Sequence, residues 1–104
     1  MGCLAAIEEI AAVDGVDGIF VGPYDLSVAM GAPAQFDRPE FAAALTRVLE
    51  AVQRAGKFCI IYADTEDAAV KRFSEGFDSV ALSMDCILYQ RAINGAVAAI
   101  KGAL

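Results

Sequence analysis

The residues best placed for chemistry form a short turn, Gly22-Pro23-Tyr24-Asp25, directly after an apolar run at residues 19–21. Glycine lets a ligand approach the backbone closely, proline fixes the turn, and the N–H groups beyond it can point at an anion. Asp25 adds a hard carboxylate oxygen, the kind of ligand that Mg²⁺ or Mn²⁺ prefers. An anion cradle beside a metal carboxylate would suit a small keto acid. The simpler interpretation is that Asp25 caps the short helix after the turn.

Composition excludes several other kinds of site. The sequence has no histidine, so it cannot hold Ser-His-Asp or Cys-His machinery or a histidine metal ligand. Its cysteines, Cys3, Cys59 and Cys86, lack CxxC spacing, and we interpret them as buried, inert thiols of a reducing compartment. The net charge is −6 and the basic residues are scattered, which argues against nucleic-acid binding. No GxGxxG dinucleotide fingerprint is present.

The sequence also lacks the features of export or membrane insertion. Its start has no basic segment followed by an apolar one, and no run approaches the roughly 18 apolar residues of a membrane span. We therefore predict a cytoplasmic protein with no membrane partner.

The elements that must position the turn alternate between strand and helix. Apolar runs without polar alternation predict buried parallel strands at residues 18–21, 57–62 and 79–83. Helices are predicted over residues 3–12 and 23–30, and from Pro39 to Gly56. Two more are predicted, one from a cap at Asp64 or Thr65 to Gly76 and one from a cap at Asp85 onward. The last of these has an apolar face with Ile93, Val97 and Ile100.

This order predicts one α/β domain over residues 1–104, with two architectures open. One is an open doubly wound sheet, although three strands would leave both of its edges bare. The other is a piece of a (β/α) barrel, which when complete takes about 250 residues. In either architecture, ligands gather at the carboxyl ends of the strands, where the turn at residues 22–25 is placed.

The stretch "GVDGIFVGPYDLSVAMG", with "RPEF" and then "GK" before the next strand, closely resembles the HpcH/HpaI aldolase family. These are class II, metal-dependent pyruvate aldolases, with (β/α) barrel relatives in the citrate-lyase β-subunit group. The resemblance runs over nearly the whole chain. It implies the C-terminal portion, about three βα units, of a (β/α)8 TIM barrel, with the sixth, seventh and eighth strands.

The resemblance also implies roles for individual residues. Asp25 matches the family's metal-binding aspartate, and the metal would be Mg²⁺, Mn²⁺ or Co²⁺. The backbone amides around Tyr24 and Asp25 match those that hold the pyruvate carboxylate, with Gly22 and Pro23 shaping the turn. Tyr62 falls where family members line the aldehyde pocket, and an ordinary packed aromatic residue is an equal alternative.

Other parts of the family's site have no match in this chain. The second metal carboxylate, a glutamate, would fall just upstream of Met1, and Glu8 and Glu9 do not replace it because they are predicted on a helix. The histidine base and the pyruvate-binding arginine belong to the first half of the barrel, and the arginines of this chain are all predicted on or at the start of helices. The chain is therefore expected to be incomplete.

The leading prediction is a part of an aldolase that cleaves or forms a 4-hydroxy-2-oxo acid, with pyruvate (or another 2-oxo acid) and an aldehyde as partners. In the complete family enzyme, the metal polarises the keto acid and stabilises its enolate. A non-catalytic half-barrel for oligomerisation or binding, and a CoA-ester lyase of the citrate-lyase β type, are the alternatives. Family members commonly exchange the last helix between subunits, so a homo-oligomer is expected, with residues 86–101 as that helix.

Overall fold

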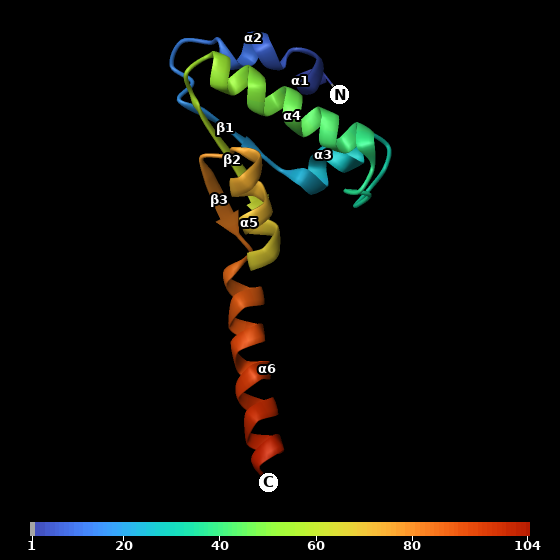
Figure 1. Cartoon of the computed structure of the whole chain (residues 1–104), viewed down its shortest axis with the longest axis vertical. Helices are drawn as coiled ribbons and strands as arrows, with labels where there is room; N and C mark the ends of the chain where they lie inside the picture. The colour runs from blue at the N-terminus through green and yellow to red at the C-terminus, as the bar shows by residue number, and fades with distance from the viewer. Residues whose placement is uncertain (1) are drawn as a thin grey trace.

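The structure is a computed structural model that describes residues 2–104, and Met1 lies outside the described residues. Its centre is a parallel sheet in the order β1-β2-β3, formed by Gly18–Val21, Phe58–Ala63 and Ser79–Leu82 (Figure 1). All three strands lie within one residue of their predicted bounds. Val21 pairs with Ile61, and Ile61 pairs with Val80, so the carboxyl ends of the strands reach one edge of the sheet.

The described residues also form six helices. Their bounds are Gly2–Ala5 (α1), Ile7–Ala11 (α2), Pro23–Ala29 (α3), Pro39–Arg54 (α4), Glu66–Glu75 (α5) and Asp85–Ala103 (α6). The prediction of a single helix over residues 3–12 is wrong in one respect. The backbone leaves the helical conformation at Ala6, so this segment forms two short helices, α1 and α2. An ion pair of 2.8 Å between Glu8 and Arg47 ties α2 to α4 and lowers the pKa of Glu8 to about 2.

The core lies between α4 and β2. The helix begins with Pro39 at its first position and ends before Gly56, whose φ of 69° suits glycine. Its apolar face packs on β2, and Val52, Cys59 and Ile61 are fully buried, at 0 % exposure. Burying a side chain of the size of Val or Ile contributes about 1.5–3 kcal/mol, so this contact is a main source of stability.

Among residues 2–104, helices cover only one face of the sheet. Along β2, Cys59, Ile61 and Ala63 are buried, since α4 and α5 pack on their side. The residues between them lie on the opposite face, which we call the bare face; it carries Phe58, Ile60 and Tyr62 of β2 and Phe20 of β1. Phe20 and Phe58 are 58 % and 64 % exposed there. A sheet with helices on one face and apolar residues on the other fits a barrel segment better than a doubly wound sheet.

Helix α5 is capped as predicted, by one of the two candidates. The Thr65 side chain accepts a hydrogen bond of 3.2 Å from the Ala68 N–H, and Gly76 ends the helix with a φ of 103°. For α6 the predicted cap is wrong. Asp85 is the first helical residue rather than the cap, and its carboxylate accepts a 2.7 Å bond from the neighbouring Cys86 N–H.

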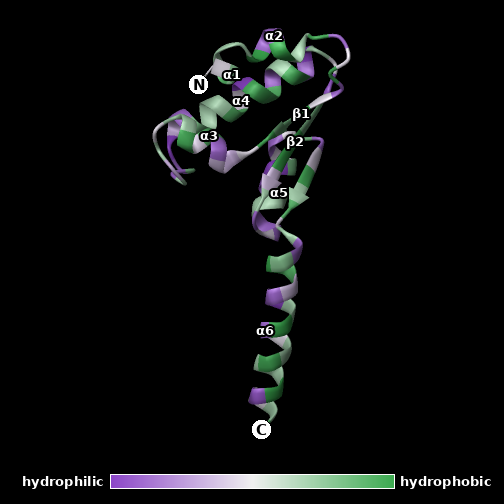
Figure 2. Cartoon of the chain, turned by 180° about the vertical axis from the view of Figure 1, so that it is seen from behind, coloured by the Kyte–Doolittle hydropathy of each residue, from purple (hydrophilic) through white to green (hydrophobic). Residues whose placement is uncertain are grey.

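Helix α6 extends away from the rest of the chain, along the 59 Å long axis of the molecule (Figure 1). It has no buried residue, and the predicted apolar face with Ile93, Val97 and Ile100 is exposed. Figure 2 shows hydrophobic residues recurring along its length. An ion pair of 3.1 Å between Arg91 and Glu66 links it to the start of α5. None of the helices in residues 2–104 is long and apolar enough to cross a membrane.

The cysteines only partly match their prediction. Cys59 is buried, and burial raises the pKa of its thiol to about 11, which makes it inert. Cys3 and Cys86 are exposed, so the prediction of three buried thiols is wrong for these two. The reason is that α1 and α6 leave those faces uncovered.

The close pairing of β1 with β2 generates a stability prediction. A Cβ atom at Gly18 would lie 2.7 Å from the backbone oxygen of Phe58, its partner in the sheet. We expect Gly18→Ala to lower the free energy of unfolding by about 1–3 kcal/mol in urea denaturation, because the backbone must move. Gly95→Ala is the control, since open space surrounds Gly95 in α6 and helix propensity predicts a gain of about 0.5–1 kcal/mol. Equal stability of Gly18→Ala and the parent chain would contradict this description.

Candidate site at the carboxyl ends of the strands

The turn after β1 leads directly into α3. Gly22 is the N-cap residue, Pro23 occupies the first helical position, and the Leu26 N–H donates a 2.9 Å hydrogen bond to the Gly22 carbonyl. Asp25 lies in the first turn of the helix and does not cap it, because the N-cap residue is Gly22 and no side-chain capping bond is formed. The simpler interpretation of Asp25 as a capping residue is therefore not what the structure shows.

The Asp25 carboxylate lies directly over Gly22. A Cβ atom built on Gly22 would lie 2.8 Å from Asp25 Oδ2, so the glycine is needed for this close approach. Among residues 2–104, no side chain forms a hydrogen bond or ion pair with Asp25. A carboxylate at the start of a helix, free of protein partners, is available to a cation.

Tyr24 is held by contacts on several sides. Its hydroxyl donates a 2.7 Å hydrogen bond to Asp64 Oδ2, and this bond raises the pKa of the Tyr24 phenol. Its ring meets Phe36 edge to face, with centroids 4.9 Å apart, and lies 6.5 Å from the ring of Tyr62. The structure thus brings two of the predicted site residues, Tyr24 and Tyr62, to the same edge of the sheet.

Tyr62 is near the end of β2, on the bare face. Burial raises the pKa of its phenol, and the Asp64 carboxylate nearby raises it further. Ser83, which follows β3, has a left-handed φ of 55° and a fully buried hydroxyl without a hydrogen-bond partner among the described residues. Polar groups from the ends of all three strands therefore gather at this edge.

Two residues of the site had no role assigned from the sequence. Asp64 is the partner of Tyr24, and only its position directly after β2 pointed to this edge. Ser27 is 1 % exposed; its Oγ donates a 2.7 Å bond to the Tyr24 carbonyl and accepts a 2.9 Å bond from the Ala34 N–H. In the sequence, the only indication of a structural role for Ser27 was its place among the apolar residues of α3. Ser27 fastens the first turn of α3 to the loop that follows the helix.

The side chains at this edge include the type of ligand that a divalent cation prefers, but too few of them to form a complete site. Carboxylate oxygens suit Mg²⁺ and Mn²⁺, and Asp25 offers them without competition. However, residues 2–104 contain no group of three or more acidic, cysteine or histidine side chains that could hold a metal ion. One oxygen of the next acidic residue along this edge, Asp64, is already bonded to Tyr24. Asp25 can therefore be one ligand of a metal, and further ligands must come from elsewhere.

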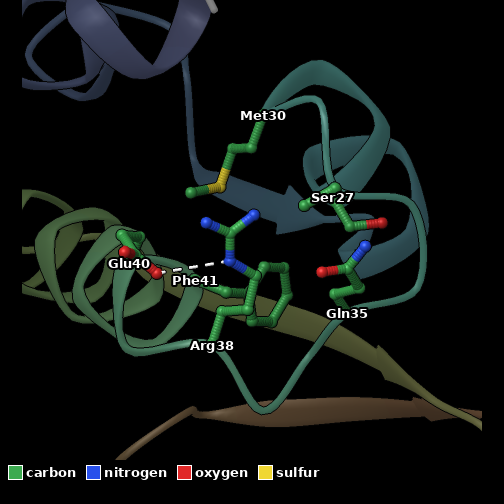
Figure 3. A pocket seen from close by; sticks show the side chains of 7 residues that line it. Ser27, Met30, Gln35, Arg38, Glu40 and Phe41 are labelled. Carbon is green, nitrogen blue, oxygen red and sulfur yellow. Dashed lines mark ion pairs between the residues drawn. The ribbon is translucent and has the colours of Figure 1, made fainter.

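A separate hollow lies behind the turn, between α3 and the start of α4. Its volume is about 110 Å³, and Arg38 crosses it toward Met30 (Figure 3). The Arg38 Nε atom pairs with Glu40 at 3.4 Å. Arg38 therefore lies at a helix start, as predicted, and its charge is paired in this hollow.

Comparison with known proteins agrees with this geometry. The sequence matches the HpcH/HpaI aldolase/citrate lyase family over residues 1–92. The chain belongs to this family. It is 37 % identical over 99 residues to a hydroxypyruvate/pyruvate aldolase of Pseudomonas aeruginosa. It is 33 % identical over 95 residues to a 2-keto-3-deoxy-L-rhamnonate aldolase of Escherichia coli.

These matches cover 95 % and 91 % of this chain, but only 37 % and 36 % of the two aldolases. Among solved structures, an HpcH/HpaI aldolase/citrate lyase family protein from Burkholderia cenocepacia superposes with a TM-score of 0.89 and 33 % identity. That match covers 94 % of this chain and 38 % of the other. The α/β fold with a parallel three-stranded sheet thus matches the barrel aldolases over part of their length, which confirms the predicted fold class at that level.

The contact between Gly22 and Asp25 generates a second prediction. In the parent chain, we expect Gly22→Ala to be destabilising, because the new Cβ displaces the Asp25 carboxylate. In an Asp25→Ala background the clash is absent. Gly22→Ala should then raise the free energy of unfolding by about 0.4–1 kcal/mol, because alanine reduces the conformational entropy of the unfolded chain. A double-mutant cycle in urea should give a coupling of about 0.5–3 kcal/mol. The same effect of Gly22→Ala in both backgrounds would show that the carboxylate does not lie over the glycine.

Proposed function

We propose that this chain is one part of a class II pyruvate aldolase, folded as a single partial-barrel domain over residues 1–104. The reaction is the cleavage or formation of a 4-hydroxy-2-oxo acid from pyruvate, or another 2-oxo acid, and an aldehyde. The observation that carries the proposal is the free Asp25 carboxylate held over Gly22, at the edge where barrel enzymes bind their substrates. Membership of the aldolase family supports the choice of reaction.

The residues of the turn have different roles in binding. Gly22 and Pro23 shape the turn, and the amides of Tyr24 and Asp25 bind the carboxylate of the 2-oxo acid. Tyr62 lies on the neighbouring strand, on the side assigned to the aldehyde, and its ring is 6.5 Å from that of Tyr24. Asp25 supplies one oxygen ligand to Mg²⁺, Mn²⁺ or Co²⁺. When bound, such a cation supplies the Lewis acidity that polarises a keto group.

The proton transfers need groups that this chain does not contain. The sequence has no histidine, and its arginines lie on or beside helices rather than at the strand ends. Loss of general base catalysis alone costs about 10²- to 10⁴-fold in rate. We therefore assign binding roles, and no catalytic residue, to this chain. The two relatives described above are named as aldolases, which favours aldol chemistry over the cleavage of a CoA ester.

We also propose that the chain forms a homo-oligomer through α6. Both edges of the described sheet are unpaired, and the apolar residues of α6 are exposed along a helix that stands apart from the sheet. Large exposed apolar patches of this kind mark interaction surfaces.

Sedimentation velocity at micromolar concentration tests this assembly. We expect a species larger than a monomer, and Ile93→Asp should shift it toward the monomer, because a charge then enters the apolar face of α6. Asn94→Asp, at the neighbouring exposed position, should leave the distribution unchanged. A compact monomer of the parent chain would contradict the proposal.

Metal binding tests the role of Asp25 directly. Titration of the chain with Mn²⁺, followed by electron paramagnetic resonance, should show weak binding, because one carboxylate makes a poor site. Asp25→Asn should weaken it by about tenfold or more, in line with the 10- to 100-fold that even residues supporting a ligand cost. The control is Asp37→Asn, which removes an exposed loop carboxylate. Undiminished Mn²⁺ binding by Asp25→Asn would refute the assignment.

A further inference from the structure

The hydrogen bond between Tyr24 and Asp64 joins two parts of the chain that are 40 residues apart. Tyr24 belongs to the turn after β1, and Asp64 is the first residue after β2. The bond is short, at 2.7 Å, and its acceptor is a carboxylate, which makes it stronger than a bond between neutral groups. It therefore connects the ends of two neighbouring strands at the candidate site.

Burial alone does not hold the Tyr24 side chain. The residue is 43 % exposed, so its ring could adopt other rotamers if only packing opposed them. Phe36 and Tyr62 contact the ring at centroid distances of 4.9 and 6.5 Å. The Asp64 carboxylate holds the far end of the side chain, and Phe36 and Tyr62 contact its ring.

The backbone of Tyr24 is held by a second anchor. The buried Ser27 hydroxyl donates to the Tyr24 carbonyl and accepts from the Ala34 N–H. Ser27 thus ties the turn to its own helix and loop, whereas Asp64 ties it to the neighbouring strand. The amides of Tyr24 and Asp25 lie on the segment that these two anchors restrain.

Asp64 has no other structural task among the described residues. It does not cap α5, because Thr65 does so. It forms no ion pair, although carboxylates on α2 and α5 do. Asp64 instead lies beside Tyr24 and Tyr62, and its carboxylate raises the pKa of both phenols.

We propose that Asp64 is a positioning residue, which acts through the Tyr24 side chain to hold the first turn of α3 in register with the end of β2. The inference rests on the proposed function, because that turn carries the amides of the carboxylate cradle and Asp25. The bond sets the spacing between the cradle, in the first turn of α3, and Tyr62 on β2. A change at Asp64 thus alters the site without removing any group that touches the substrate.

Amide hydrogen exchange of the isolated full chain, measured by NMR, tests this inference. The Leu26 N–H bonds to the Gly22 carbonyl at 2.9 Å and reports on closure of the turn. We expect Asp64→Ala and Tyr24→Phe, each of which removes the hydrogen bond between Tyr24 and Asp64, to speed the exchange of the Leu26 N–H by about tenfold, as for loss of a hydrogen bond to a charged group. The double variant should add nothing further. The Ala69 N–H, bonded to Thr65 at 2.9 Å within α5, should not change.

A second readout separates positioning from general loss of structure. In chains with ¹³C-labelled tyrosine, Asp64→Ala should lower the pKa of the Tyr24 phenol toward its ordinary value, because the hydrogen bond to Asp64 is the main cause of its rise. Asp67→Ala and Tyr89→Phe are the matched controls. If Asp64→Ala left the exchange of the Leu26 N–H unchanged, or if the effects of Asp64→Ala and Tyr24→Phe were additive, the inference would be wrong.

The outcome is independent of the metal experiment. Suppose that Mn²⁺ binding depends on Asp25 but the exchange rate of the Leu26 N–H does not change when Asp64 is substituted. That result would refute the positioning role and leave the proposed function intact. Coupled exchange without any Mn²⁺ binding would refute the proposed function and leave the coupling between Asp64 and Tyr24 established.

Discussion

Parallel pairing of the three strands is the constraint on which the site depends. Val21 pairs with Ile61, and Ala63 pairs with Leu82, so the residues that follow each strand emerge at one edge. Asp25, Asp64 and Ser83 come from distant parts of the sequence and reach the same edge because of this pairing. The packing of α4 and α5 on one face stabilises it, with Cys59 and Ile61 fully buried beneath them.

The same arrangement leaves the other face of the sheet without helices. In a closed barrel, that face points inward and is filled by side chains from the remaining strands. The described residues place Phe20 and Phe58 there, largely exposed, and α6 extends away beyond β3. These surfaces and the 37 % coverage of the Pseudomonas aeruginosa aldolase support the same proposal, that this chain works together with further barrel units.

Local signals allowed much of the fold to be predicted, because glycine and proline mark where apolar runs begin and end. Gly56 and Gly76 end α4 and α5 as expected. The bare face could not be predicted, since both faces of β2 are apolar and the sequence therefore shows no alternation. The contact of Tyr24 with Asp64 was out of reach for a different reason: it depends on two side-chain orientations 40 residues apart. A glycine and an acid in one turn predicted that the Asp25 carboxylate would belong to the site. The close approach of this carboxylate to Gly22 could not be predicted.

We propose that this chain holds one share of an aldolase site. The most direct test is cleavage of a 4-hydroxy-2-oxo acid with Mg²⁺, Mn²⁺ or Co²⁺, assayed for the chain alone and mixed with a polypeptide that carries the first five βα units of a relative. We expect no measurable release of pyruvate from the chain alone, and metal-dependent release from the mixture that is lost with Asp25→Ala. Robust cleavage by the pure chain, unaffected by Asp25→Ala, would contradict the account.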